Sequence, residues 1–125
     1  MRLLLDTHVY LWYLADSPKL SATARATIAS AEEIFVSAAS IWEATIKAGL
    51  GKVKADLPRL VEGIEASGFS ELPVTAAHAA AVAHLRPLHR DPFDRLLVAQ
   101  AIFEPLRLLT ADPALVQYSD LVQLV

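Results

Sequence analysis

Four carboxylate side chains stand where the chain is expected to leave a buried strand or to begin a helix. Asp6 directly follows the apolar run Leu3-Leu4-Leu5. Glu43 and Asp112 closely follow strand-like segments, and Asp94 lies just inside a predicted helix start. The strands of a parallel sheet end at one edge, so acids that are distant in the sequence can meet there. Ligands that are all oxygen indicate Mg²⁺ or Mn²⁺ rather than zinc.

Three of these acids also have a purely structural explanation. The pattern Ser40-x-x-Glu43 fits a helix capping box, and Glu43 with Lys47 fits an ion pair one helical turn apart. Asp94 would lie in a first helical turn, where the helix dipole favours an anion. Asp112 is placed like an N-cap. Each explanation accounts for one residue, and none accounts for all of them.

Asp6 is harder to explain by structure alone, because a carboxylate at the end of a buried strand is costly unless it is paired or binds a metal. Its structural alternative is an N-cap for the helix that is predicted to begin at Val9. If the four acids gather at one sheet edge, their mutual repulsion needs compensation. A divalent cation would provide it, and we interpret Asp6, Glu43, Asp94 and Asp112 as a metal site.

Several neighbours of the acids are candidates for supporting roles. Thr7 and Thr110 are placed to donate hydrogen bonds to the metal ligands. His8 is expected to be a hydrogen-bonding partner of an acid rather than a ligand, although ligation stays open. Asp91, directly before a proline, is expected to cap a helix, and a supporting role in the site stays open as well.

The remaining pattern alternates strands with helices. The sequence predicts strands at 3–5, 34–36, within 69–74, at 106–110 and at 121–125, and helices at 9–15, 22–31, 37–49, 56–66, 76–85 and 91–104, with a helical turn from Asp112. This alternation is typical of a three-layer α/β fold with a mainly parallel sheet of about five strands. A length of 125 residues favours one domain that spans residues 1–125.

Composition narrows the class of protein further. A chain that is 54% hydrophobic and 20% charged is typical of an ordered globular protein. The absence of cysteine excludes disulfides, thiolate zinc sites and a cysteine nucleophile. Asp6 and His8 interrupt the first apolar run too early for a signal peptide, and no stretch is long enough to span a membrane. We expect a cytoplasmic protein with no membrane partner.

The net charge of −3 counts against a protein that binds nucleic acid through a broad basic surface. A polyanionic substrate would need metal ions, a local basic patch or both. Arg86, Arg90 and Arg95 are candidates for phosphate contacts. Arg95 has an alternative role as the ion-pair partner of Asp91, four residues earlier, and all of these charges could be ordinary solvated ones.

Two segments carry more apolar and aromatic side chains than one small core obviously needs. They are the stretch with Val9, Tyr10, Trp12 and Tyr13, and the helix with Ile41, Trp42 and Ile46. Core packing is expected to account for most of them. The rest are candidates for a groove that receives a partner helix and for a homodimer face.

The ordered set of acidic segments resembles the PIN-domain ribonucleases, specifically the VapC-type toxins of bacterial toxin–antitoxin pairs. The segments are Leu-Leu-Leu-Asp6-Thr-His, Ser-Ile-Trp-Glu43, Asp91-Pro-Phe-Asp94-Arg-Leu-Leu-Val-Ala-Gln-Ala and Leu-Leu-Thr-Ala-Asp112. No single segment is specific, but their order and separations together cover essentially the whole chain. One departure is Ala111, which stands where many relatives carry a polar residue.

This resemblance implies a sheet flanked by helices, Mg²⁺- or Mn²⁺-dependent hydrolysis of RNA to 5′-phosphate and 3′-hydroxyl ends, and inhibition by a cognate antitoxin. Its acidic positions fall on Asp6, Glu43, Asp94 and Asp112, and a hydroxyl position falls on Thr7. Enzymes with an aspartyl nucleophile are a poorer match, because the second acid that they need is absent. A non-catalytic binding or regulatory module with the same fold is the main alternative.

Overall fold

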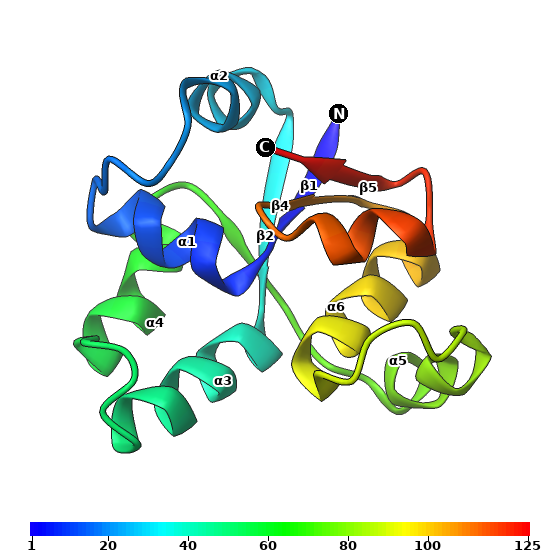
Figure 1. The fold of residues 1–125 in the computed structure, drawn as a ribbon. Coiled ribbons are helices and arrows are strands. Elements are labelled where there is room, and N and C mark those ends of the chain that lie inside the picture. The colour runs from blue at the N-terminus through cyan, green and yellow to red at the C-terminus, as the bar shows by residue number, and fades with distance from the viewer.

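A computed structural model describes residues 1–125, and its centre is a sheet of five parallel strands (Figure 1). The strands lie in the order β3-β2-β1-β4-β5. They are Arg2–Leu5 (β1), Glu33–Ser37 (β2), Ser70–Leu72 (β3), Arg107–Thr110 (β4) and Val122–Leu124 (β5). The predicted α/β fold with a sheet of about five strands is confirmed, and the sheet is parallel throughout.

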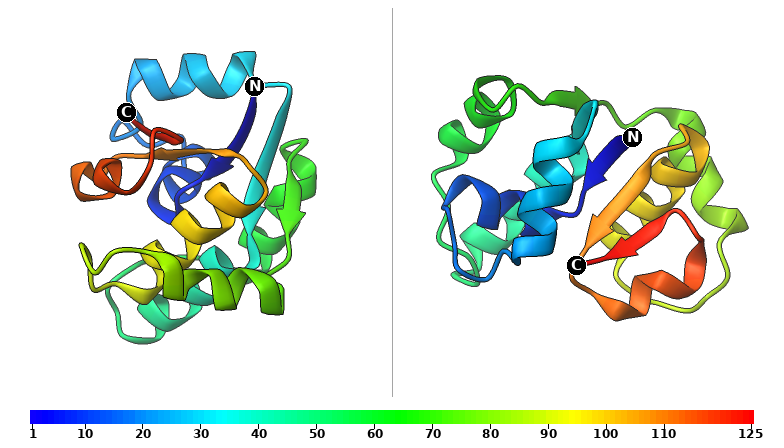
Figure 2. Two further views of the ribbon diagram at one scale, coloured as in Figure 1. Left: turned by 90° about the vertical axis from the view of Figure 1, so that its right-hand side faces the viewer. Right: turned by 90° about the horizontal axis from the view of Figure 1, so that it is seen from above.

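Helices cover both faces of this sheet, as the two further views in Figure 2 show. The helices are Thr7–Leu14 (α1), Ala22–Ser30 (α2), Ala38–Gly49 (α3), Leu57–Ala66 (α4), Ala76–Ala81 (α5) and Pro92–Phe103 (α6), with 3₁₀ turns at Val82–His84 (η1) and Pro113–Tyr118 (η2). None of them combines the length and the apolar character that crossing a membrane requires.

The alternation of side chains along β1 divides the hydrophobic core into two layers. Leu3 and Leu5 pack with buried residues of α1, α2 and α4 on one face of the sheet. Leu4 faces the other way and packs with buried residues of α6 and η2. Because β1 is covered on both faces and paired on both edges, its last residue is held rigidly, and so is the acid that follows it.

A side chain caps each of the six α-helices and the turn η2. Asp91 and Asp112 are N-caps as predicted, and Ser21 and Thr75 cap the helices that are predicted to begin directly after them. Asp56 is an N-cap instead of the first helical residue. The first helix begins at Thr7 instead of Val9, because Asp6 is its N-cap. Ser37 caps α3 by accepting a hydrogen bond from the backbone N–H of Ala39, so the capping box of Ser40 and Glu43 is wrong.

The helix after Thr75 is shorter than predicted. It ends at Ala81 and tightens into the 3₁₀ turn Val82–His84, whereas the sequence predicts a helix to Leu85. The chain then forms a loop that leads to α6. This loop carries two of the candidate phosphate-binding arginines, Arg86 and Arg90, and also His89.

Candidate active site

The carboxyl ends of three strands and the start of α6 bring the predicted acids together. β1 ends at Asp6, β2 leads into the helix that carries Glu43, and β4 leads to Asp112. Asp94 lies in the first turn of α6 and is electrostatically coupled to Asp6 and Glu43. In Figure 1 the first strand and β2 run side by side toward the point where α1 and α3 begin.

Asp6 is buried, with only 4% of its surface exposed, and protein donors hold both of its carboxylate oxygens. The backbone N–H of Thr7 donates to Oδ1 over 2.7 Å, and the hydroxyl of Thr110 donates to Oδ2 over 2.6 Å. The same Thr110 oxygen accepts a hydrogen bond from the backbone N–H of Asp112 over 3.0 Å. One buried hydroxyl therefore fixes the carboxylate of Asp6 and the chain position of Asp112.

Replacing Thr110 with Val should destabilise the protein by about 2 kcal/mol, because a hydrogen bond to a charged group is lost and the N–H of Asp112 loses its acceptor. The side chain keeps its shape, so packing changes little. Thr110→Ser keeps the hydroxyl and is the matched control. Urea denaturation of the three proteins measures the difference, and equal losses for Val and Ser would assign the effect to packing.

Glu43 is also buried, and it lies against the first helix. Its Oε1 accepts a hydrogen bond from the Thr7 hydroxyl over 2.7 Å, and its Oε2 is bound by the ammonium of Lys47. The hydroxyl of Ser40 lies 2.9 Å from the same Thr7 oxygen. The predicted ion pair of Glu43 with Lys47 is confirmed, and it lies within the cluster of acids.

His89 is the residue of this site that the sequence interpretation missed. Its Nε2 lies 2.8 Å from Oδ2 of Asp94 and 3.9 Å from Oδ2 of Asp112. A lone histidine in a loop, without a metal-ligand spacing, gives no signal in the sequence. The one hint in the sequence is that His89 lies two residues before the predicted cap Asp91, which places it near the start of α6 and therefore near Asp94.

Burial and repulsion raise the pKa of the two central acids. Desolvation raises the pKa of Asp6, against the lowering effect of its hydrogen bonds from Thr110 and Thr7. Desolvation raises the pKa of Asp94 to about 6, and the charges of Asp6 and Asp91 add to this, while the hydrogen bond from His89 lowers it. Anions that burial and repulsion destabilise in this way would be stabilised by a cation.

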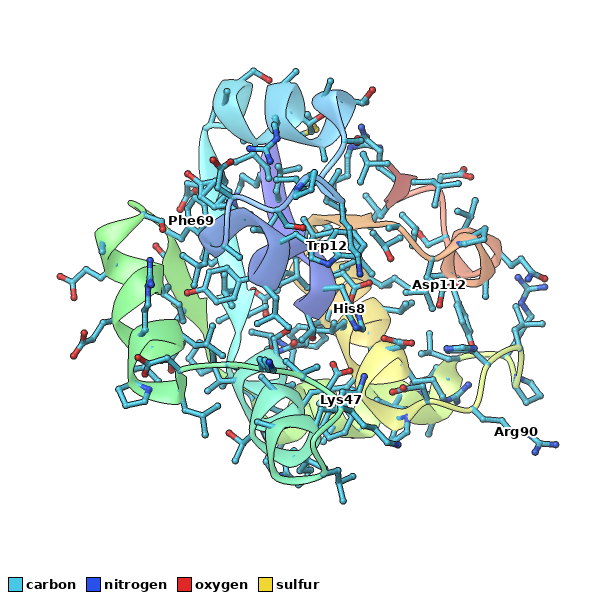
Figure 3. All side chains as sticks on the ribbon, turned by 60° about the vertical axis from the view of Figure 1, so that its left-hand side comes forward. His8, Trp12, Lys47, Phe69, Arg90 and Asp112 are labelled. Carbon is cyan, nitrogen blue, oxygen red and sulfur yellow. The ribbon has the colours of Figure 1, made fainter.

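The donor atoms fit a divalent cation. Ligand atoms of His89, Asp94 and Asp112 lie within 4.8 Å of one another, which is close enough for all three to contact one ion. Asp6 faces the same hollow as Asp112, a depression of about 320 Å³ that His8 and Trp12 also line. Figure 3 shows His8, Trp12 and Asp112 on one side of the molecule. His8 itself is exposed.

The three candidate arginines have different surroundings. The guanidinium of Arg95 donates hydrogen bonds to the carbonyl oxygens of Arg86, over 3.0 Å, and Val82, over 3.4 Å, so it clamps the loop and does not pair with Asp91. Arg86 donates to the carbonyl of Gln117 over 2.6 Å. Arg90 is exposed and points away from the body of the protein (Figure 3).

A comparison with protein families matches residues 3–121 to the PIN domain. The chain belongs to the PIN-domain family. This PIN domain is 35% identical over 115 residues to Ribonuclease VapC22 of Mycobacterium tuberculosis, an alignment that covers 87% of this chain and 85% of the relative. The resemblance that the acidic segments suggested is thereby confirmed.

Solved structures share the fold of this PIN domain at lower sequence identity. A crystal structure of VapBC2 from Rickettsia felis, bound to a DNA fragment from its promoter, matches with a TM-score of 0.70 and 19% identity, over 100% of this chain and 98% of that chain. A toxin–antitoxin complex from Klebsiella pneumoniae matches with a TM-score of 0.69 and 16% identity, over 97% and 95%.

Proposed function

We propose that this VapC-type PIN domain is the ribonuclease toxin of a toxin–antitoxin pair, and that it hydrolyses RNA with Mg²⁺ or Mn²⁺. The observation that carries the proposal is the set of acids at one sheet edge. Asp6 and Asp94 have raised pKa values, and ligand atoms of Asp94, Asp112 and His89 lie close enough together to contact one cation. The ribonuclease among its relatives, aligned over most of both chains, supports RNA as the substrate.

In this proposal Asp6 and Asp94 would hold the metal ion, with Asp112 as a further ligand of the same site. A bound divalent cation would lower the pKa of a water molecule, so that the water loses a proton and attacks the phosphate as hydroxide. The cation would also shield the negative charge of the phosphate from the acids. The Thr7 N–H and the Thr110 hydroxyl hold Asp6 in place, and His89 holds the oxygen of Asp94. Thr7 and Lys47 fix Glu43 beside these ligands.

Arg90 is the candidate for an RNA phosphate contact, since the other two arginines of the loop bind carbonyl oxygens of the protein. Arg90→Glu should weaken RNA binding several-fold and make it less sensitive to salt, with the slope of log Kd against log salt falling by about one. Lys19→Glu makes the same charge change in the exposed loop between α1 and α2. Filter binding at several salt concentrations compares the two, and equal effects would remove Arg90 from the interface.

The partner in this proposal is a cognate antitoxin protein, and solved relatives are such complexes. The candidate RNA-binding residue Arg90 and the candidate metal ligands lie at the same edge of the sheet. An antitoxin that binds this edge would therefore contact both. We propose that the chain also forms a homodimer through an apolar stripe that runs along α3 to its C-cap residue, Leu50. Trp42 is 61% exposed, Ile46 38% and Leu50 64%, and the spacing of four residues places them on one face.

Sedimentation at micromolar concentration should give a dimer for the wild-type protein and a monomer for Ile46→Glu, because a charge at the centre of the apolar stripe cannot be desolvated there. Val116→Glu places the same charge at an exposed apolar position of η2 and should leave the dimer intact. A wild-type protein that is monomeric throughout this range would refute the dimer.

Cleavage of a mixed pool of structured RNA tests the enzymatic proposal. Purified protein free of antitoxin is assayed with Mg²⁺, with Mn²⁺ and with EDTA, beside Asp6→Asn prepared identically to exclude a contaminating nuclease. We expect cleavage that requires the metal and that the substitution abolishes. A folded protein that binds Mn²⁺ and cuts none of the pool would favour a binding module with the same fold.

A further inference from the structure

The cluster of acids contains a cation of its own. Lys47 lies one turn after Glu43 on α3, and its ammonium binds Oε2 of that carboxylate. The side chain of Glu43 is 2% exposed and that of Lys47 26% exposed, so the charged contact lies largely away from solvent. Figure 3 shows Lys47 directed from α3 toward the start of α6. The contact of Lys47 with Glu43 is therefore a largely buried ion pair and not one on the solvent-exposed surface.

Protein donors already bind both oxygens of Glu43. The Thr7 hydroxyl donates to Oε1 over 2.7 Å, and Lys47 binds Oε2. The negative charge of Glu43 is thus neutralised by a cation of the protein, whereas the donors to Asp6, the Thr7 N–H and the Thr110 hydroxyl, are uncharged and leave its charge uncompensated. Asp94 differs, because the side-chain partner of its carboxylate is His89, which also lies near Asp112. Ligand atoms of Asp94 and Asp112 lie within 4.8 Å of each other, and Asp6 lines the same hollow as Asp112.

Lys47 interacts electrostatically with three acids, Glu43, Asp91 and Asp94. Partial burial lowers the pKa of its ammonium, but the hydrogen bond to Glu43 and the charges of Glu43, Asp91 and Asp94 raise it more, so the pKa lies above its ordinary value. Lys47 is thus a permanent cation next to Glu43 and within electrostatic range of Asp94. Asp91, the other acid near it, uses Oδ1 to cap α6.

Two-metal nucleases place their ions about 4 Å apart and need carboxylates that serve both of them. We propose that the ammonium of Lys47 replaces a second metal ion, so that this site binds one divalent cation through Asp6, Asp94 and Asp112 while Glu43 is held by the lysine. This inference rests on the proposed metal-dependent function and specifies its metal count. It makes Lys47 a positioning residue for Glu43.

The number of Mn²⁺ ions bound per chain tests this inference. Calorimetric titration at pH 7.5 and constant ionic strength, with electron paramagnetic resonance of free Mn²⁺ as a second method, is applied to wild type, Lys47→Met and Lys47→Arg. Lys47 is partly exposed, so these variants should fold. We expect one ion in the wild type and in Lys47→Arg, and a second, weaker ion in Lys47→Met, because Glu43 then lacks its cation.

A thermal readout separates this role from simple stabilisation. In EDTA, Lys47→Met should melt at a lower temperature than wild type, since Glu43 is left buried and unpaired. Mn²⁺ should then raise its melting temperature by more than it raises that of wild type. A lysine with a merely structural role would lower melting in EDTA but would add neither a second ion nor a larger response to Mn²⁺.

Three results would overturn the inference. Two ions of similar affinity in the wild type, or one ion of unchanged affinity in Lys47→Met, would refute the role of Lys47 and leave the metal-dependent nuclease intact. A wild-type protein that binds no Mn²⁺ and cuts no RNA would refute the proposed function, and the inference with it. Asp94→Asn, titrated in parallel, should lose the first ion and so identifies which site is occupied.

Discussion

Replacing Asp94 with Asn should abolish RNA cleavage and, in the same protein, stabilise the metal-free fold at neutral pH. The loss of activity should be at least about 100-fold, because removing a group that only orients a metal ligand already costs up to that factor. The gain in stability should reach up to about 3 kcal/mol, from a pKa that folding raises from 3.8 to about 6.

The sign of the stability change follows from proton binding. Between pH 3.8 and about 6 the folded protein holds the Asp94 proton more tightly than the unfolded chain, so the stability of the metal-free protein falls as pH rises through this range. Above about pH 6 the full cost of the buried, repelled carboxylate is present. Asparagine removes the charge, so the benefit is greatest at pH 7 to 8 and disappears near pH 4.

Urea denaturation in EDTA across this pH range measures the difference between Asp94→Asn and wild type. The control is Asp120→Asn, because Asp120 is exposed and has no hydrogen-bond or ion-pair partner. That change should alter the free energy of unfolding by less than about 0.5 kcal/mol at every pH. A variant at position 94 that is less stable than wild type at pH 7.5 would show that the acids do not repel one another as described.

Manganese should raise the melting temperature of the wild-type protein strongly and in a pH-dependent way. An ion at 100 times its Kd adds about 2.7 kcal/mol to the free energy of unfolding, which for a chain of this length corresponds to about 10 °C. At pH 5 the same Mn²⁺ concentration should give a smaller shift. Protons then compete at Asp94, and the affinity falls about tenfold for a pKa of about 6.

Differential scanning fluorimetry at pH 5 and 7.5, with and without Mn²⁺, makes this measurement. Asp6→Asn should remove the shift at both pH values, while Asp120→Asn should keep it. A shift that is the same at both pH values would mean that the ion binds away from Asp94. A shift that survives Asp6→Asn would exclude Asp6 as a ligand.

The fold was predictable from apolar runs and helix caps in the sequence, because the strands and helices that these features favour locally are the ones that pack in the tertiary structure. Short apolar runs became parallel strands, and side-chain caps such as Ser21 and Asp91 start helices where the sequence places them. The pattern of Ser40 and Glu43 misled for a physical reason. A spacing of three residues occurs at a helix start and equally within a helix, where both side chains turn inward to Thr7.

The acids of the site were predictable as a set, but their individual surroundings were not. That Thr110 joins Asp6 to Asp112, or that His89 reaches Asp94, depends on loop geometry that residue types alone do not encode. Arg95 illustrates the same limit. Its charge indicates a phosphate or an acid as partner, whereas its guanidinium binds carbonyl oxygens of its own loop.

The hydrogen bond between Thr110 and Asp6 joins residues that lie 104 positions apart in the chain. During translation the ribosome makes Asp6 first, and at about 5 to 20 residues per second it needs about 5 to 20 seconds more to reach Thr110. Until then β1 lacks its neighbour β4, and the carboxylate lacks its clamp. On the proposed function, the nascent chain would lack a complete active site during this interval, and a partner protein would have that time to bind before RNA cleavage is possible.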